Sequence, residues 1–188
     1  LTLTDTTVSK VSDGSLIGGT TIDQVLTVGE TVQADTAISS TVNAPVFSTT
    51  LYTGDGALSK VINTGIDNTG KSLLWFKNRD FAQWNTLVDT IRGDTSALYS
   101  NEASAEDTAS KRVNDFLSDG VNITSNATVN EPGDGHVVWN FRAAPGFFDV
   151  LSWSGNSVNG RQISHDLGSA PGAIIIKNLT NTANWEFW

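Results

Sequence analysis

The residues that could most readily carry acid–base chemistry are the two histidines, His136 and His165. Ser164, His165 and Asp166 are adjacent and supply the residue types of a serine hydrolase. The residues of a catalytic triad meet through the fold, however, whereas neighbours on an extended chain point to opposite faces. The Gly-x-Ser-x-Gly motif is also absent from the sequence. We therefore predict that the protein is not an enzyme and has no catalytic residues.

Carboxylates beside glycines are the second group of candidates. Asp55 lies between Gly54 and Gly56, and Asp134 precedes Gly135; loop oxygens of this kind can bind calcium. The sequence has neither an EF-hand spacing nor a calcium-binding nonapeptide repeat, and Asp-Gly pairs are typical of turns. The absence of cysteine excludes thiolate metal sites. We expect no cofactor and no metal site, with calcium binding left open.

The tripeptide Arg92-Gly93-Asp94 has the sequence of an integrin-binding motif. Three residues are few enough to occur in this order by chance. The tripeptide also follows Val88 and Ile91 at the end of a predicted strand, where a turn is needed. We therefore interpret it as a turn.

Composition and charge narrow the function classes further. The formal net charge is −9, whereas nucleic-acid binding requires clustered Lys and Arg. Charged residues make up 16% of the chain, which suits a surface of hydroxyl and amide groups on turn-rich β structure. No apolar run reaches membrane-spanning length. We expect no nucleic-acid partner and no membrane insertion.

Two stretches about 100 residues apart have the same order of residues. In the first, residues 52–55 (Tyr-Thr-Gly-Asp) are followed by Leu-Leu-Trp-Phe-Lys-Asn at residues 73–78. In the second, residues 153–156 (Trp-Ser-Gly-Asn) are followed by Ala-Ile-Ile-Ile-Lys-Asn at residues 173–178, after one deletion. This order predicts a complete module over residues 47–150 and the start of a second, truncated copy over residues 151–188.

The elements that must position these residues are strands. Apolar and alternating runs separated by Gly, Asn and Asp turns predict an all-β protein, an antiparallel β-sandwich or jelly roll. Two long core strands are expected at residues 136–142 and 147–153. Residues 95–115 alone have helical composition, and a surface loop with one helical turn fits them equally well. Residues 1–46 lack aromatic residues and predict an extended β-rich stem or assembly arm.

The aromatic residues are expected mainly in the core, although a sheet can also present aromatic faces to sugars. Because side chains alternate along a strand, either Trp75 or Phe76 should point outward. Trp84 and Trp185 both follow a Lys-Asn pair, near predicted loops. They are our candidates for a binding or subunit-contact role. At the position equivalent to His165, the first copy has Thr64, so His165 serves no chemistry common to both copies.

Four segments carry a family resemblance: Leu73–Arg79, Asp89–Gly93, Val138–Asp149 and Gly160–Gly172. They resemble tandem β-rich domains of unknown function from virion structural proteins of tailed phages, especially marine phages and cyanophages. The resemblance covers about residues 50 to 188. It implies a virion protein, with a tail fibre or appendage as the expected place, and it brings no catalytic residues.

We therefore expect a structural and adhesive tail-fibre or appendage subunit on the exterior of the virion tail or capsid. Its expected partners are copies of itself in a homotrimer, other virion proteins and host surface glycans. Two alternatives stay open. One is a capsid decoration or head-fibre protein, and the other is a lectin-like carbohydrate-binding module or glycan depolymerase.

Overall fold

The computed structural model describes residues 25–28, 31–34 and 44–188 and divides the chain into two units, Leu1–Ala44 and Pro45–Trp188. Within the first unit, β1 (Val25–Val28) pairs antiparallel with β2 (Thr31–Ala34). The rest of the predicted stem, residues 1–46, lies largely outside the described residues.

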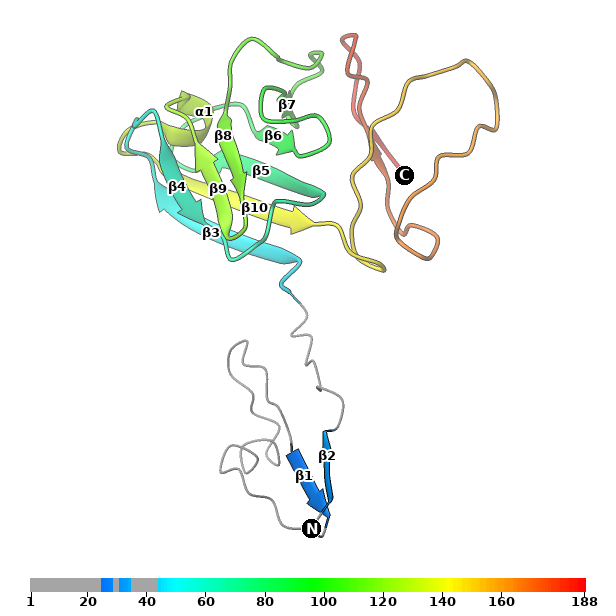
Figure 1. The fold of residues 1–188 in the computed structure, drawn as a ribbon. Coiled ribbons are helices and arrows are strands. Elements are labelled where there is room, and N and C mark those ends of the chain that lie inside the picture. The colour runs from blue at the N-terminus through cyan, green and yellow to red at the C-terminus, as the bar shows by residue number, and fades with distance from the viewer. Residues whose placement is uncertain (1–24, 29–30, 35–43) are drawn as a thin grey trace. The chain divides into compact units, whose positions relative to one another are not determined.

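The second unit is an antiparallel sandwich of two sheets (Figure 1). The five-stranded sheet has the order β3 (Phe47–Thr53), β10 (Gly135–Arg142), β5 (Ser72–Asn78), β6 (Thr86–Asp89) and β7 (Leu98–Tyr99). The three-stranded sheet has the order β4 (Lys60–Asn63), β9 (Gly120–Ile123) and β8 (Val113–Leu117). Every strand pair is antiparallel. The prediction of an all-β antiparallel fold is confirmed.

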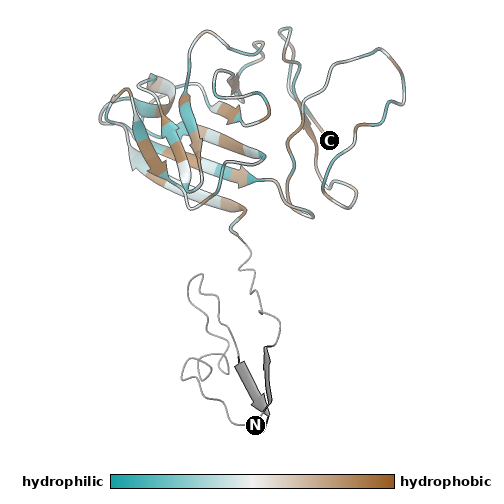
Figure 2. Cartoon of the chain, viewed as in Figure 1, coloured by the Kyte–Doolittle hydropathy of each residue, from teal (hydrophilic) through white to brown (hydrophobic). Residues whose placement is uncertain are grey.

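The core lies between the two sheets because one face of each strand is apolar. Figure 2 shows apolar residues along the strands of both sheets. In β5, Leu74 and Phe76 are fully buried, whereas Leu73 and Trp75 on the opposite face are only partly covered. Phe76 therefore belongs to the core and Trp75 faces outward, as strand alternation requires. The buried core is Ile62, Leu74, Phe76, Val88, Ala97, Val113, Val121, Ile123, Val129 and Val138.

A buried polar network lies beside this apolar core. The Asn140 side chain accepts hydrogen bonds from Thr64 Oγ1 at 2.7 Å and from Asn68 Nδ2 at 2.9 Å. Its own Nδ2 donates to Asn68 Oδ1 at 2.8 Å. All three residues are buried. Since buried polar groups need partners, this network favours the one register of β10 that brings Asn140 within hydrogen-bond distance of Asn68.

Of the two alternatives for residues 95–115, a helix or a surface loop with a helical turn, the structure shows loop with the short strand β7 and the start of β8, and no helical turn. The one-turn helix α1 lies instead at Ala127–Asn130, where the Asn126 side chain caps it by accepting from the Thr128 amide at 3.0 Å. The prediction of a strand at residues 147–153 was wrong. The amides of Phe147 and Phe148 both donate to the Ala144 oxygen, at 3.1 and 3.2 Å, so the chain folds back in a tight turn after Pro145.

The remaining chain, from about residue 149, forms irregular loops and a short hairpin beside the sandwich (Figure 1). The hairpin consists of β11 (Ile175–Ile176) and β12 (Glu186–Phe187). No helix within the described residues has the length and apolarity needed to cross a membrane.

Candidate functional site

The outer face of the five-stranded sheet, turned away from the core, has apolar side chains on three adjacent strands. We define this outer face as the outward residues of three adjacent strands: Phe47, Thr49 and Leu51 of β3, Val137, Trp139 and Phe141 of β10, and Leu73, Trp75 and Lys77 of β5. Phe47 and Leu51 are exposed, Trp75 and Trp139 are partly covered, and Val137 is buried. Apolar surface of this kind on a sheet commonly marks an interaction site.

Two tryptophans form the centre of the outer face. Trp75 and Trp139 are directly opposite across β5 and β10, with ring centroids 5.8 Å apart and ring planes at 67°. This edge-to-face geometry is a favoured arrangement for aromatic pairs and fixes both rings. At one end of the sheet, Phe141 packs on Phe47 at 4.9 Å. The outer face thus offers fixed aromatic rings to a ligand.

The two tryptophans singled out in the sequence both contact Tyr99. The Trp84 ring packs on the Tyr99 ring, with centroids 4.8 Å apart. The Trp185 indole N–H donates to the backbone oxygens of Tyr99 and Glu102, at 3.0 and 3.1 Å. Trp84 remains about half exposed. The structure therefore brings both residues to one strand, and Trp185 attaches the C-terminal segment to the sandwich.

Tyr99 is itself held by an ionic cluster that sequence reasoning missed. Its hydroxyl donates to Asp107 at 2.5 Å, and Arg112 contacts both the Tyr99 hydroxyl and, at 2.7 Å, the Asp107 carboxylate. Burial and the hydrogen bond to Asp107 raise the pKa of Tyr99 well above its usual range. No local spacing signals this cluster, because its members come from β7, a loop and the residue that precedes β8.

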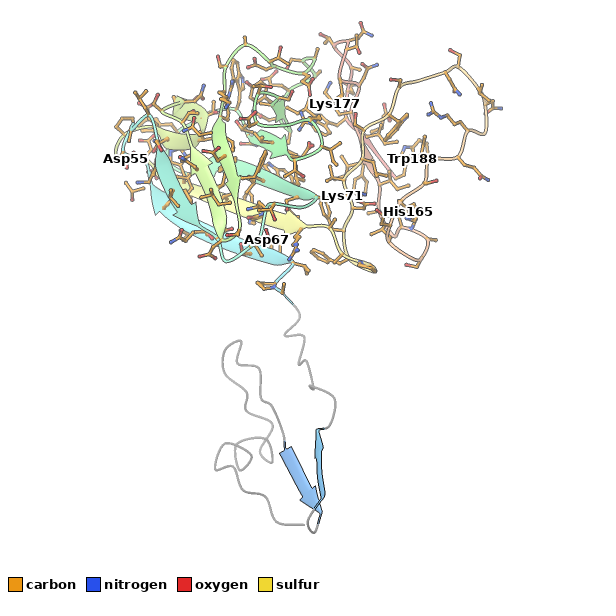
Figure 3. All side chains as sticks on the ribbon, in the orientation of Figure 1. Asp55, Asp67, Lys71, His165, Lys177 and Trp188 are labelled. Carbon is orange, nitrogen blue, oxygen red and sulfur yellow. The ribbon has the colours of Figure 1, made fainter. Side chains whose placement is uncertain are left out.

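Two lysines attach the C-terminal segment at separate points (Figure 3). Lys71 Nζ lies 2.7 Å from Asp166 and 3.1 Å from Asp149. Its hydrogen bonds to these carboxylates, chiefly the one to Asp166, raise the pKa of Lys71. Lys177 Nζ donates to the Ala103 oxygen at 3.2 Å, and burial lowers the pKa of Lys177. Both lysines have structural partners that account for their positions.

The histidines do not form a catalytic arrangement. His165 is exposed, and its Nδ1 accepts from the amide of Leu167 at 3.3 Å. The carboxylate of its neighbour Asp166 is paired with Lys71. His136 is fully buried in β10 and stacks on Tyr52, with ring centroids 5.2 Å apart. Burial lowers the pKa of His136, so the ring is neutral in the folded protein near neutral pH.

The two carboxylates weighed as calcium ligands have protein partners. Asp55 accepts from Lys60 at 2.7 Å and from the Ala57 amide at 2.9 Å, and these bonds lower the pKa of Asp55 to about 2. Asp134 accepts from Asn78 Nδ2 at 2.7 Å. Within the described residues, no group of three or more His, Asp or Glu side chains is arranged to hold a metal ion.

The tripeptide Arg92-Gly93-Asp94 forms a turn whose arginine is engaged inside the protein. The Arg92 side chain pairs with Asp89 at 2.6 Å and with Glu106 at 3.1 Å, and only 8% of it is exposed. Gly93 has a φ of 89°, which favours glycine. Because the guanidinium is buried in ion pairs, it is not presented for recognition by another protein.

These features define an all-β protein built on an antiparallel sandwich, with aromatic rings on one open sheet face. The chain belongs to the family described as a domain of unknown function (DUF7483), whose model matches residues 42–188. No match was found among curated proteins or among solved structures. The family description assigns no activity, so a function has to be argued from the geometry.

Proposed function

We propose that this protein is a structural and adhesive component of a tailed-phage virion, a tail-fibre or appendage subunit that assembles as a homotrimer and contacts the host surface. The resemblance of residues 50–188 to phage virion domains motivates the location. The observation that carries the adhesive role is the outer face, where Trp75 and Trp139 hold a fixed edge-to-face geometry on an open sheet. The proposal includes no catalytic step.

The chemistry of the outer face suits a carbohydrate. Sugar rings have apolar C–H faces that pack on aromatic rings, and Thr49 and Lys77 add hydrogen-bonding groups beside Trp139 and Trp75. A partly polar sheet face fits an exposed glycan chain better than a small molecule, which requires a concave pocket.

Glycan-array binding by the wild type and the Trp75→Ala variant tests the adhesive role. The loss of one stacked ring should weaken binding by about tenfold, which corresponds to about 1.4 kcal/mol. Phe81→Ala removes a more exposed aromatic residue that does not belong to the outer face as defined, and it should leave binding unchanged. Absence of glycan binding by the wild type would contradict the adhesive role.

Two further measurements test the rest of the proposal. Electron microscopy with an antibody against the protein should label phage tails; labelling of heads would favour the capsid-decoration or head-fibre alternative. Light scattering on the purified full chain should give three times the chain mass of 20.0 kDa. Release of reducing ends from host polysaccharide would replace the non-enzymatic reading with a depolymerase.

A further inference from the structure

The β11–β12 hairpin has the same pairing as β5–β6, shifted by about 100 residues for both partners of each pair. Ile175 is opposite Phe187 and Ile176 opposite Glu186, as Trp75 is opposite Leu87 and Phe76 opposite Thr86. The backbones of Ile174 and Trp188 exchange two hydrogen bonds, at 2.9 and 3.0 Å, where Leu74 is opposite Val88 in β5–β6.

The turns after β5 and β11 also match. Asn78 Oδ1 accepts from the amides two and three residues ahead, at 2.9 Å each. Asn178 Oδ1 accepts from the amides two and three residues ahead, at 2.9 and 3.0 Å. An asparagine at the equivalent position therefore fixes the turn after both strands, and the hairpin is the structural counterpart of the β5–β6 pair of the sandwich.

The surroundings of the two pairs differ. Leu74 and Val88 are fully buried, but their counterparts Ile174 and Trp188 are 42% and 72% exposed. β5 lies between β6 and β10, whereas β11 pairs with β12 alone among the described strands. The N–H and C=O of Ile174 bond to Trp188 of the neighbouring strand. Because these groups alternate in direction along a strand, the N–H and C=O of Ile175 point to the opposite, unpaired edge. An unpaired apolar edge is a template for another strand.

We propose that β11 accepts an antiparallel strand of the β10 type on this edge, by strand addition. In the sandwich, β10 places Trp139 opposite Trp75 and Val138 opposite Phe76. A strand with the same alternating pattern would bring its tryptophan opposite Ile175 and its valine opposite Ile176. The backbone bonds supply affinity and the alternate side chains supply specificity. The inference does not depend on a virion location.

Hydrogen bonds to the sandwich hold the hairpin in place. The Trp185 indole N–H donates to the backbone oxygens of Tyr99 and Glu102. The Ala183 amide donates to the Ala103 oxygen, and the Glu106 amide to the Leu179 oxygen, each at 2.9 Å. These bonds hold the hairpin on the sandwich before any strand binds. A fixed acceptor loses less conformational entropy on binding.

A labelled peptide with the sequence of residues 133–144, which contains β10, provides the probe. Its fluorescence anisotropy should rise saturably on titration with the full chain, and a scrambled peptide should not bind. Ile175→Lys should weaken binding by at least about tenfold, because the substitution places a charge on the paired edge. The matched control is Val158→Lys, since Val158 is 61% and Ile175 59% exposed.

Amide hydrogen exchange locates the peptide independently of any variant. The Ile175 amide should exchange more slowly when the peptide is bound. Absence of binding, or binding that is equal in Ile175→Lys and Val158→Lys, would overturn the proposal. A third outcome would also overturn it: the chain self-associates, Ile175→Lys abolishes the self-association, and the peptide does not compete with it. The occupant of the edge would then be a second copy of the chain.

Discussion

Trp84 and Trp185 contact the same residue from two directions: the Trp84 ring packs on the Tyr99 ring, and the Trp185 indole N–H donates to the Tyr99 backbone oxygen at 3.0 Å. Tyr99 belongs to β7, the edge strand of the five-stranded sheet. The C-terminal segment is therefore attached to the edge of the sandwich, and this contact can be measured separately from the stability of the core.

Trp185→Phe should loosen that attachment while keeping an aromatic ring. The variant loses the hydrogen bonds to Tyr99 and Glu102, at a cost of about 1 kcal/mol. The Glu106 amide, which donates to the Leu179 oxygen, should exchange its hydrogen faster. Trp84→Phe is the control and should leave the exchange rate of Glu106 unchanged, and equal acceleration in both variants would refute the separate role of Trp185.

Asn140→Leu should lower the free energy of unfolding by about 2–4 kcal/mol. The substitution leaves Thr64 and Asn68 buried without their partner, and each unsatisfied group costs about 1–3 kcal/mol. Urea unfolding measures the effect. Asn63→Leu, the same substitution at an exposed position of β4, should change the stability by about 0.5 kcal/mol or less. A similar loss in both variants would argue against the network.

His136 should make the fold sensitive to mild acid. Burial lowers the pKa of His136 below its ordinary value of 6.5, so the unfolded chain binds more protons than the folded chain once the pH falls below 6.5. Stability is full above that pH and is lost as the pH falls towards the folded pKa. His136→Phe should flatten the curve of melting temperature between about pH 7 and pH 5; a curve that keeps the wild-type slope would exclude His136 as the cause.

Arg92→Ala should destabilise the protein by about 3 kcal/mol, because it leaves the buried Asp89 carboxylate without its cation. Arg79→Ala removes an exposed arginine and should cost about 0.5 kcal/mol or less. Chemical unfolding of both variants measures the difference. If Arg92→Ala were as stable as Arg79→Ala, the ion pair would be unimportant and the tripeptide would again be open to a role in recognition.

The sequence was sufficient for the fold class because strand periodicity is local. The alternation in residues 72–78 correctly predicted that one of Trp75 and Phe76 faces outward, and the structure shows that it is Trp75. The same reasoning failed at residues 147–153, where an apolar run resembled a strand. The chain turns after Pro145, and the Asp149 side chain accepts hydrogen bonds from the amides of Val150 and Asp166, so no strand pairing forms.

Contacts between residues distant in the sequence were not predictable. Trp84 and Trp185 could be singled out because they recur, but their common contact with Tyr99 depends on how the C-terminal segment folds back. The Trp75–Trp139 pair depends in the same way on the register of β10 against β5. A single sequence shows the periodicity of its apolar residues and the residues typical of turns. The register between strands depends instead on packing and on buried polar groups such as Asn140.

The alternation of β10 places residues with different roles on opposite faces of one strand. Asn140 and Val138 face the core and fix register, while Trp139 between them faces outward and is only partly covered. Under the proposed function, a substitution at Trp139 would change what the sheet binds and would leave the core residues of the same strand in place. New binding targets could then be acquired by substitutions that do not touch the determinants of folding.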